Sequence, residues 1–143
     1  MKLVRQLLDA KGANVVAVAP GTSVLDAIKM MAEQGIGALA VMQESQLVGI
    51  VTERDYARKV ILKGRASDTT TVSEIMTSDL ITTSKNETVS ECMSLMTDKH
   101  IRHLPVLEND AIAGMISIGD LVKAVIADQR EEIEHLENYI SGS

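Results

Sequence analysis

Two short segments of the chain place a hydroxyl side chain three residues before an aspartate. They are Thr52-Glu53-Arg54-Asp55 and Ser117-Ile118-Gly119-Asp120, and each follows an apolar run with the character of a strand. A helix that begins at such a point has backbone N–H groups without intrahelical partners and a positive partial charge, which together favour a phosphate. The hydroxyl adds a donor, and the aspartate can accept hydrogen bonds from both hydroxyls of a ribose. The spacing therefore predicts a nucleotide site at each strand-to-helix junction.

The same spacing is also typical of a capping box, in which the hydroxyl and the carboxylate satisfy the first N–H groups of a helix without any ligand. For one copy alone, the cap is the simpler interpretation. The presence of two copies, each preceded by a glycine (Gly49 and Gly114), favours ligand binding. The plain cap stays open as the alternative.

The two segments are corresponding parts of an internal repeat. A shift of 65 residues places the chain on itself without a gap, so that Val24 corresponds to Val89 and Asp55 to Asp120. Each copy is predicted to hold a strand, a helix, a hairpin and a second helix. The ranges in the first copy are Val15–Val18, Thr22–Glu33, Ala38–Met42, Leu47–Thr52 and Glu53–Lys63; in the second they are Leu80–Thr82, Glu87–Lys99, His103–Leu107, Ile112–Ser117 and a helix from Ile118 onward.

This repeat predicts the α/β (α+β) class, with two β-α-β-β-α units packed sheet to sheet in pseudo-twofold symmetry and a helix at the C-terminus. Each unit is too small to cover its sheet alone. The predicted division gives residues 1–66 to the first repeat with an N-terminal helix, 67–127 to the second repeat and 128–143 to a helical tail. Residues 64–71, which are mostly small and polar, form the predicted linker.

Composition excludes several functions. The net charge of −6 argues against nucleic-acid binding, although residues 53–65 hold five basic side chains against two acidic ones and favour a small anion. No apolar run approaches the roughly 18 residues that span a membrane. The charged N-terminus and the single cysteine, Cys92, favour a cytoplasmic protein. With no Walker loop, metal-spaced set or nucleophile–base pair, we predict no enzyme, no metal and no catalytic cofactor.

Two features predict a homodimer. The helices at 24–33 and 89–96 carry a wider apolar arc than one sheet needs, which indicates either a thick core or a methionine-lined contact surface. The tail has apolar residues at the 4-3-4-3-4 spacing of a coiled-coil seam. That seam consists of Val122, Ile126, Gln129, Ile133, Leu136 and Ile140, and Gly142 ends the helix.

The repeat resembles the cystathionine-β-synthase (CBS) domain family in its tandem-pair form, in particular small bacterial pairs without a catalytic domain. The segments that carry this resemblance are Ala19-Pro20, 24–31, 36–41 and 47–55 in the first copy, and Ile101–Val106 and Gly114–Asp120 in the second. The resemblance implies that adenosyl ligands (AMP, ADP, ATP, NAD or S-adenosylmethionine) bind in clefts between the copies. It also implies disc-like dimers of pairs.

Carried over by position, the resemblance implies a role for each matching residue. Thr52 and Ser117 would lie beside the phosphate, and Asp55 and Asp120 would bind the ribose. Arg54, Arg102 and His103 would contact the phosphates, and Ile50, Ile81 and Pro105 would line the adenine slot. The copies differ, because the first has Gly37-Ala38 where the second has Arg102-His103, and this weighs against two equal sites.

Three functions follow from these observations. The first is a sensor that binds AMP, ATP or NAD(H) and alters its dimer contacts or its contacts with an unidentified regulated protein. The second is a ligand-free dimerisation scaffold in which the two motifs are only caps. An enzyme acting on nucleotides is the third and weakest, since nothing in the chain indicates turnover.

Overall fold

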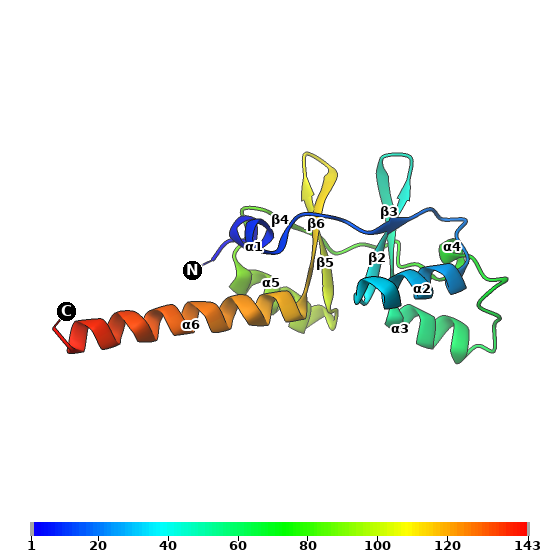
Figure 1. Cartoon of the computed structure of the whole chain (residues 1–143). Helices are drawn as coiled ribbons and strands as arrows, with labels where there is room; N and C mark the ends of the chain where they lie inside the picture. Colours follow the sequence, from blue (N-terminus) through cyan, green and yellow to red (C-terminus); the bar gives the residue numbers. More distant parts are fainter. Residues whose placement is uncertain (1, 143) are drawn as a thin grey trace. The chain divides into compact units, whose positions relative to one another are not determined.

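The computed structural model describes residues 2–142, which form two compact units (Figure 1). The first-repeat unit holds residues 14–81 together with 109–112. The second-repeat unit holds residues 82–108 and 113–142, together with the N-terminal residues 2–13. Each unit contains a three-stranded sheet, in the order β1-β2-β3 and β4-β5-β6. The predicted α+β class with two corresponding repeats and a C-terminal helix is confirmed.

In the first-repeat unit, β1 (Ala17–Val18) runs parallel to β2 (Ala38–Gln43), and β2 pairs in antiparallel fashion with β3 (Gln46–Thr52). Helix α2 (Val24–Gln34) begins where the Ser23 side chain accepts a hydrogen bond from the Asp26 N–H at 3.1 Å. It ends at Gly35, whose φ of 65° is the left-handed conformation that glycine adopts without strain. After β3 the chain enters α3 (Glu53–Tyr56), which continues as a π-helical turn, η1 (Ala57–Ile61).

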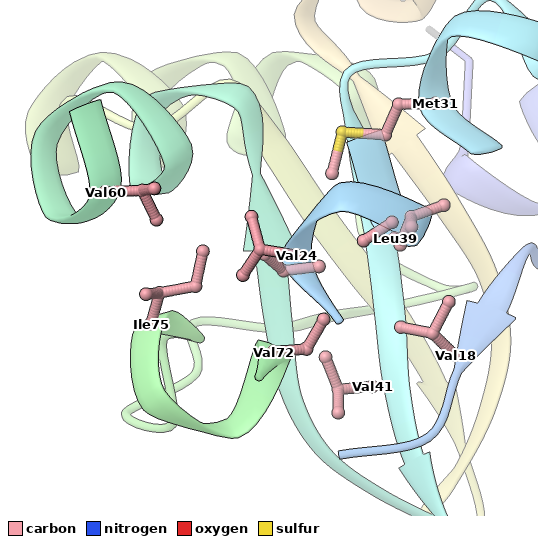
Figure 2. Close-up of a cluster of buried hydrophobic side chains, with 10 residues drawn as sticks. Val18, Val24, Met31, Leu39, Val41, Val60, Val72 and Ile75 are labelled. Atoms are coloured by element: carbon pink, nitrogen blue, oxygen red, sulfur yellow. The ribbon is translucent and has the colours of Figure 1, made fainter. Parts of the chain in front are cut away.

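The core of this unit lies between its sheet and its helices (Figure 2). Val24, Ala27 and Met31 are spaced at i, i+3 and i+7, so that α2 turns one buried face toward Leu39 and Val41 of β2. Burying each side chain of this size contributes about 1.5–3 kcal/mol. This packing holds β3 in place, and therefore fixes where its C-terminal residue Thr52 meets α3.

In the second-repeat unit, β4 (Thr83–Ser84) runs parallel to β5 (His103–Glu108), which neighbours β6 (Ala111–Ser117). Helix α5 (Val89–Lys99) is capped by Thr88, and α6 (Ile118–Ile140) follows β6 directly. Cys92 is buried in α5. The buried apolar residues of this unit are Val4, Leu7, Leu8, Val89, Cys92, Met96, Leu104, Val106, Ile116, Leu121 and Ala124.

A short helix that precedes each repeat packs on the other repeat. Helix α1 (Val4–Lys11) belongs to the second-repeat unit, where the Val4 N–H donates to the Glu87 carbonyl at 2.9 Å. Helix α4 (Val72–Ile75), in the segment that leads into the second repeat, belongs to the first-repeat unit, where the Val24 N–H donates to the Thr70 carbonyl at 2.8 Å. The units therefore cross the predicted boundary, because the N-terminal helix assigned to 1–66 packs within the second-repeat unit.

The predicted first strand of each copy is displaced along the chain. The paired residues are Ala17–Val18 instead of 15–18, and Thr83–Ser84 instead of Leu80–Thr82. The apolar Leu80–Ile81 favoured the earlier range. The buried Thr83 is accommodated because its hydroxyl lies 3.3 Å from the Cys92 sulfur, which satisfies a polar group at that position. Helix α4 was not predicted, because four residues are too few to show a period.

Candidate functional site

The first-repeat junction forms a complete capping box. The Thr52 hydroxyl accepts a hydrogen bond from the Asp55 N–H at 3.1 Å, and Asp55 Oδ2 accepts from the Thr52 N–H at 3.0 Å. The Thr52 hydroxyl also lies 3.1 Å from Asp55 Oδ2, to which it donates its proton. The junction therefore has the geometry of a capping box, in which the Thr52 hydroxyl proton is already used by Asp55.

The second oxygen of Asp55 is also engaged. Asp55 Oδ1 accepts a hydrogen bond from the Thr77 hydroxyl at 3.2 Å and pairs with Lys59 Nζ at 3.0 Å. The Asp55 side chain is only 9% exposed, so these partners replace water. Both carboxylate oxygens that would bind a ribose are thus bound within the first-repeat unit.

The second-repeat junction forms the same box with a different outer partner. The Ser117 hydroxyl accepts from the Asp120 N–H at 3.2 Å, and Asp120 Oδ2 accepts from the Ser117 N–H at 2.8 Å. Lys11, at the end of α1, donates to Asp120 Oδ2 at 2.5 Å and to the Met115 carbonyl at 2.6 Å. The Ser117 hydroxyl also interacts with the Asp120 carboxylate and helps to stabilise its charge, and within residues 2–142 Asp120 Oδ1 accepts no other hydrogen bond. The Asp120 side chain is 20% exposed, so Oδ1 is accessible to a ligand.

The charge of Asp120 is stabilised by its neighbours. Partial burial alone would raise the pKa of its carboxyl, since burial disfavours the charged form. The hydrogen bonds from Lys11 and from the Ser117 N–H, together with the Lys11 charge, outweigh burial and place the Asp120 pKa below its ordinary value. The carboxylate is therefore ionised at neutral pH and able to accept two ribose hydroxyls.

A basic residue lies beside the second junction and has no counterpart at the first. The Arg102 carbonyl accepts the Ile118 N–H at 2.9 Å, which places Arg102 and the following His103 next to the beginning of α6. At the corresponding place in the first repeat, the Gly37 carbonyl accepts the Glu53 N–H at 3.1 Å. The side chain of Arg102 is exposed. The second junction thus combines a helix N-terminus, a hydroxyl, a carboxylate and a guanidinium.

The predicted site residues fall into two groups, one in each unit. Arg102, His103, Pro105, Ser117 and Asp120 lie in the second-repeat unit, and Ile50, Thr52, Arg54, Asp55 and Ile81 lie in the first-repeat unit. Arg54 is exposed in the first turn of α3, and Ile81 is half-buried. Pro105 is buried in β5, and Ile50 is buried in β3, where it pairs through its backbone with Thr77.

Three residues in the two junctions were not predicted as site residues. Lys59 lies one helical turn after Asp55, and the i, i+4 spacing could have revealed it. Thr77 and Lys11 lie 22 and 109 residues from the aspartates that they contact, and no local pattern links them. They lie at the junctions because α1 packs in the second-repeat unit and the segment of α4 packs in the first-repeat unit.

The remaining polar groups do not form a second chemical centre. A hollow of about 500 Å³ in the second-repeat unit is lined by Thr83, Glu87, Glu91 and Cys92, among others, and includes none of the predicted site residues. Burial raises the pKa of the Cys92 thiol, and the nearby Glu87 and Glu91 charges raise it further, so the thiol is protonated at neutral pH. Among residues 2–142 no cluster of His, Cys, Asp and Glu could hold a metal ion. No described helix is both long and apolar enough to cross a bilayer.

Two known CBS proteins are similar to this chain, one in sequence and one in both sequence and structure. CBSX3, a mitochondrial CBS domain-containing protein of Arabidopsis thaliana, is 46% identical over 125 residues, which are 84% of this chain and 61% of CBSX3. The solved structure of a putative signal-transduction protein with CBS domains from Burkholderia ambifaria MC40-6 is 51% identical, with a TM-score of 0.86 over 90% of this chain and 96% of that one.

A more distant structure shares the fold. The CBS domain pair of protein MJ0100, crystallised with 5′-methylthioadenosine and S-adenosyl-L-methionine, has a TM-score of 0.78 at 24% identity, over 90% of this chain and 98% of that one. The family model of the CBS domain matches residues 6–62 and 72–127, two consecutive copies that cover most of the sequence. This chain therefore belongs to the CBS domain family, as a tandem pair.

Proposed function

We propose that this CBS pair is a regulatory module that binds an adenine nucleotide (AMP, ATP or NAD(H)) and responds by changing its contacts within a homodimer or with a regulated protein. In this proposal the chain catalyses no reaction. Two comparisons support the ligand class and the role. The MJ0100 pair was crystallised with two adenosyl compounds, and the Burkholderia relative is described as a signal-transduction protein.

The observation that carries the proposal is the unused hydrogen-bonding capacity at the second junction. Asp120 Oδ1 can accept a ribose hydroxyl, and the Ser117 hydroxyl can turn from the Asp120 carboxylate to donate to a phosphate oxygen. The junction lies at the N-terminus of α6, a helix of 23 residues, whose dipole favours an anion. Arg102, beside the same junction, can hold two phosphate oxygens at once.

The first junction lacks these capacities. The Thr52 hydroxyl donates to Asp55, and both Asp55 oxygens have partners in the first-repeat unit. Helix α3 spans four residues before it changes to a π-helical turn, so its dipole is weaker. We therefore expect one strong nucleotide site, built on Ser117 and Asp120, and a structural role for Thr52 and Asp55.

Titration calorimetry on the full chain tests this proposal with AMP, ATP, NAD, NADH, S-adenosylmethionine and adenosine. Asp120→Ala should weaken nucleotide binding by about 10- to 100-fold, the loss of a charge-assisted contact worth about 1.5–3 kcal/mol. Asp55→Ala is the matched control and should retain the affinity wherever circular dichroism shows a folded chain. Arg102→Gln should weaken AMP binding and leave adenosine binding unchanged.

A ligand-free scaffold is the second candidate, and the complete capping boxes at both junctions favour it. The two candidates differ in a simple measurement. A sensor purified without denaturation should carry excess absorbance at 260 nm or bind at least one of the six compounds. Absence of binding to all six, or unchanged affinity in folded Asp120→Ala, would rule out the proposed site and leave the scaffold.

A further inference from the structure

The outer part of α6 has an apolar face with no partner within the described chain. Every residue from 129 to 142 is exposed, and α6 extends well beyond α1 and α5 of its own unit (Figure 1). The exposed fraction is 55% for Ile133, 61% for Leu136 and 81% for Ile140. A helical segment of about this length is marginal in water without packing. It also has no basic residue in its last turn to offset the helix dipole. A partner on the apolar face would stabilise the segment.

The apolar positions of α6 have the period of a two-stranded coiled coil. In heptad notation, Ile126, Ile133 and Ile140 occupy position a, and Val122, Gln129 and Leu136 occupy position d. Apolar residues that repeat at a and d form the seam of a coiled coil. Val122 and Ile126, in the half of α6 that packs on the unit through Leu121 and Ala124, are 41% and 43% exposed, so the seam stays open there as well.

Charge distinguishes the two possible directions of pairing. Residues 118–130 contain two acidic and two basic side chains, whereas residues 131–143 contain four glutamates and no lysine or arginine. A parallel pair would place the two acidic halves side by side. An antiparallel pair places each acidic half along a neutral half that contains Lys123 and Arg130, and it also opposes the two helix dipoles.

The residues that flank the seam support the same direction. In an antiparallel pair in which all six seam positions meet, Lys123 faces Glu137 of the second copy and Val125 faces its Tyr139. In a parallel pair, Glu132 would face Glu137 of the second copy twice. The antiparallel arrangement therefore has two attractive contacts and two repulsive ones, because Arg130 and Glu132 each meet their own counterpart at the centre, whereas the parallel arrangement has two repulsive contacts and no attractive one.

We propose that the exposed face of α6 binds α6 of a second copy of this chain in antiparallel orientation, with the two helices centred near residue 131. Ile126 then packs on Leu136 of the second copy, Gln129 on Ile133, and Val122 on Ile140. The contact uses residues other than Ser117 and Asp120, so this inference does not rest on the proposed nucleotide site.

Cross-linking of the full chain tests the direction. Chains carrying Val122→Cys are mixed with chains carrying Ile140→Cys and a mass tag, and a short bismaleimide is added. The antiparallel contact should give the mixed cross-linked dimer in high yield, whereas Ile140→Cys alone should give none. Glu131→Cys, at the centre but on the outer face of the helix, is the matched control. A dimer cross-linked through Ile140→Cys alone, or no mixed dimer, would overturn the proposal.

Charge reversal gives an independent test by sedimentation equilibrium. Glu137→Lys should raise the dimer Kd about fivefold, because it places a lysine opposite Lys123. The effect is modest because a single exposed ion pair changes an affinity by less than about tenfold. Lys123→Glu combined with Glu137→Lys should restore the affinity. Glu137→Lys also lowers the net negative charge of the chain and places a basic residue near the C-terminal end of α6. Both of these general effects should strengthen the dimer, so a weaker dimer must come from the contact with Lys123. A Kd that is unchanged or tighter in Glu137→Lys, or a chain that is monomeric at micromolar concentration, contradicts the antiparallel contact.

Discussion

The two strand-to-helix junctions have the same capping box but obtain their outer partners in different ways. In the first, the backbone N–H of Thr77 donates to the Ile50 carbonyl at 2.8 Å, and its hydroxyl donates to Asp55 at 3.2 Å. In the second, the single side chain of Lys11 contacts both the Met115 carbonyl, at 2.6 Å, and Asp120, at 2.5 Å. Met115 corresponds to Ile50 in the repeat, so Lys11 takes the place of a backbone segment.

This difference shows how a duplicated motif can acquire two roles without a change in the motif itself. Thr77 and Lys59 bind the oxygen of Asp55 that the capping box leaves open, and that junction becomes a closed structural element. Lys11 binds the oxygen that the capping box already uses, so Asp120 keeps its other oxygen for a ligand. Thr77 and Lys11 come from the segments that contain the exchanged short helices, whereas Lys59 belongs to the first repeat itself.

The largest expected effect that tests this comparison is on stability. Asp55→Ala removes the cap together with a carboxylate that is only 9% exposed and that holds Thr77 and Lys59, which should cost about 2–4 kcal/mol. Asp120→Ala removes a cap and an ion pair on a carboxylate that is 20% exposed, and should cost about 1–2 kcal/mol. Urea unfolding followed by circular dichroism measures both. Equal losses would mean that the two junctions are structurally equivalent.

The glycine before each junction gives an effect of intermediate size. A Cβ on Gly49 would lie 2.7 Å from the Met76 sulfur and 3.0 Å from the Thr77 carbonyl oxygen, whereas a Cβ on Gly114 would meet only the side chain of Leu8, at 2.8 Å. Gly49→Ala should therefore cost more, within about 1–3 kcal/mol, because a backbone oxygen cannot move aside as a side chain can.

Gly21→Ala is the control for the glycine comparison. No atom lies within 4 Å of a Cβ at Gly21, so its free energy of unfolding should change by no more than about 0.5 kcal/mol. A larger loss in Gly114→Ala than in Gly49→Ala would show that the α1 contact is the more rigid of the two.

The smallest expected effect is a pH dependence. The Asp120 pKa is lower in the folded chain than its unfolded value of about 3.9, so its ionisation stabilises the fold above that pH. This contribution is lost as the pH falls through the lowered pKa. Lys11→Met should reduce the loss between pH 7 and 3 by less than about 1 kcal/mol, since the pair is partly exposed.

Urea unfolding at a series of pH values measures this contribution. Glu74 and Glu108 also have lowered pKa values and titrate in the same range, so the informative quantity is the difference between variant and unmodified chain. Lys63→Met, a change at an exposed lysine of the other unit, should leave the pH profile as it is. An identical profile in Lys11→Met would mean that Lys11 does not stabilise the Asp120 carboxylate.

The sequence predicted those features that local pattern determines. The shift of 65 residues gave the order of the repeats, and the predicted ranges Thr22–Glu33 and Glu87–Lys99 lie within two residues of the bounds of α2 and α5. The capping-box geometry at Thr52 and Ser117 was predictable for the same reason, because it involves residues three apart.

The remaining features depend on contacts between distant parts of the chain. No pattern around Asp120 reveals a lysine 109 residues away, and none around Asp55 reveals Thr77. The repeat therefore could not reveal the difference between the junctions, because both copies have a hydroxyl residue and an aspartate at the same two positions. Sheet-to-sheet packing, the tail seam and the ligand roles of the site residues stay predictions.

The packing of α1 in the second-repeat unit affects the order in which the protein folds during synthesis. Residues 14–81 contain nearly all of the first-repeat unit, which can assemble as soon as they leave the ribosome. Val4, Leu7 and Leu8 find their burial only in the second-repeat unit, which includes residues up to Leu121 and beyond. At about 5–20 residues per second, the apolar face of α1 stays uncovered for roughly 5 to 20 seconds of synthesis. Helix α1 thus emerges well before the residues that bury it, and the long-range Lys11–Asp120 contact slows closure of the fold as contacts of high sequence separation do.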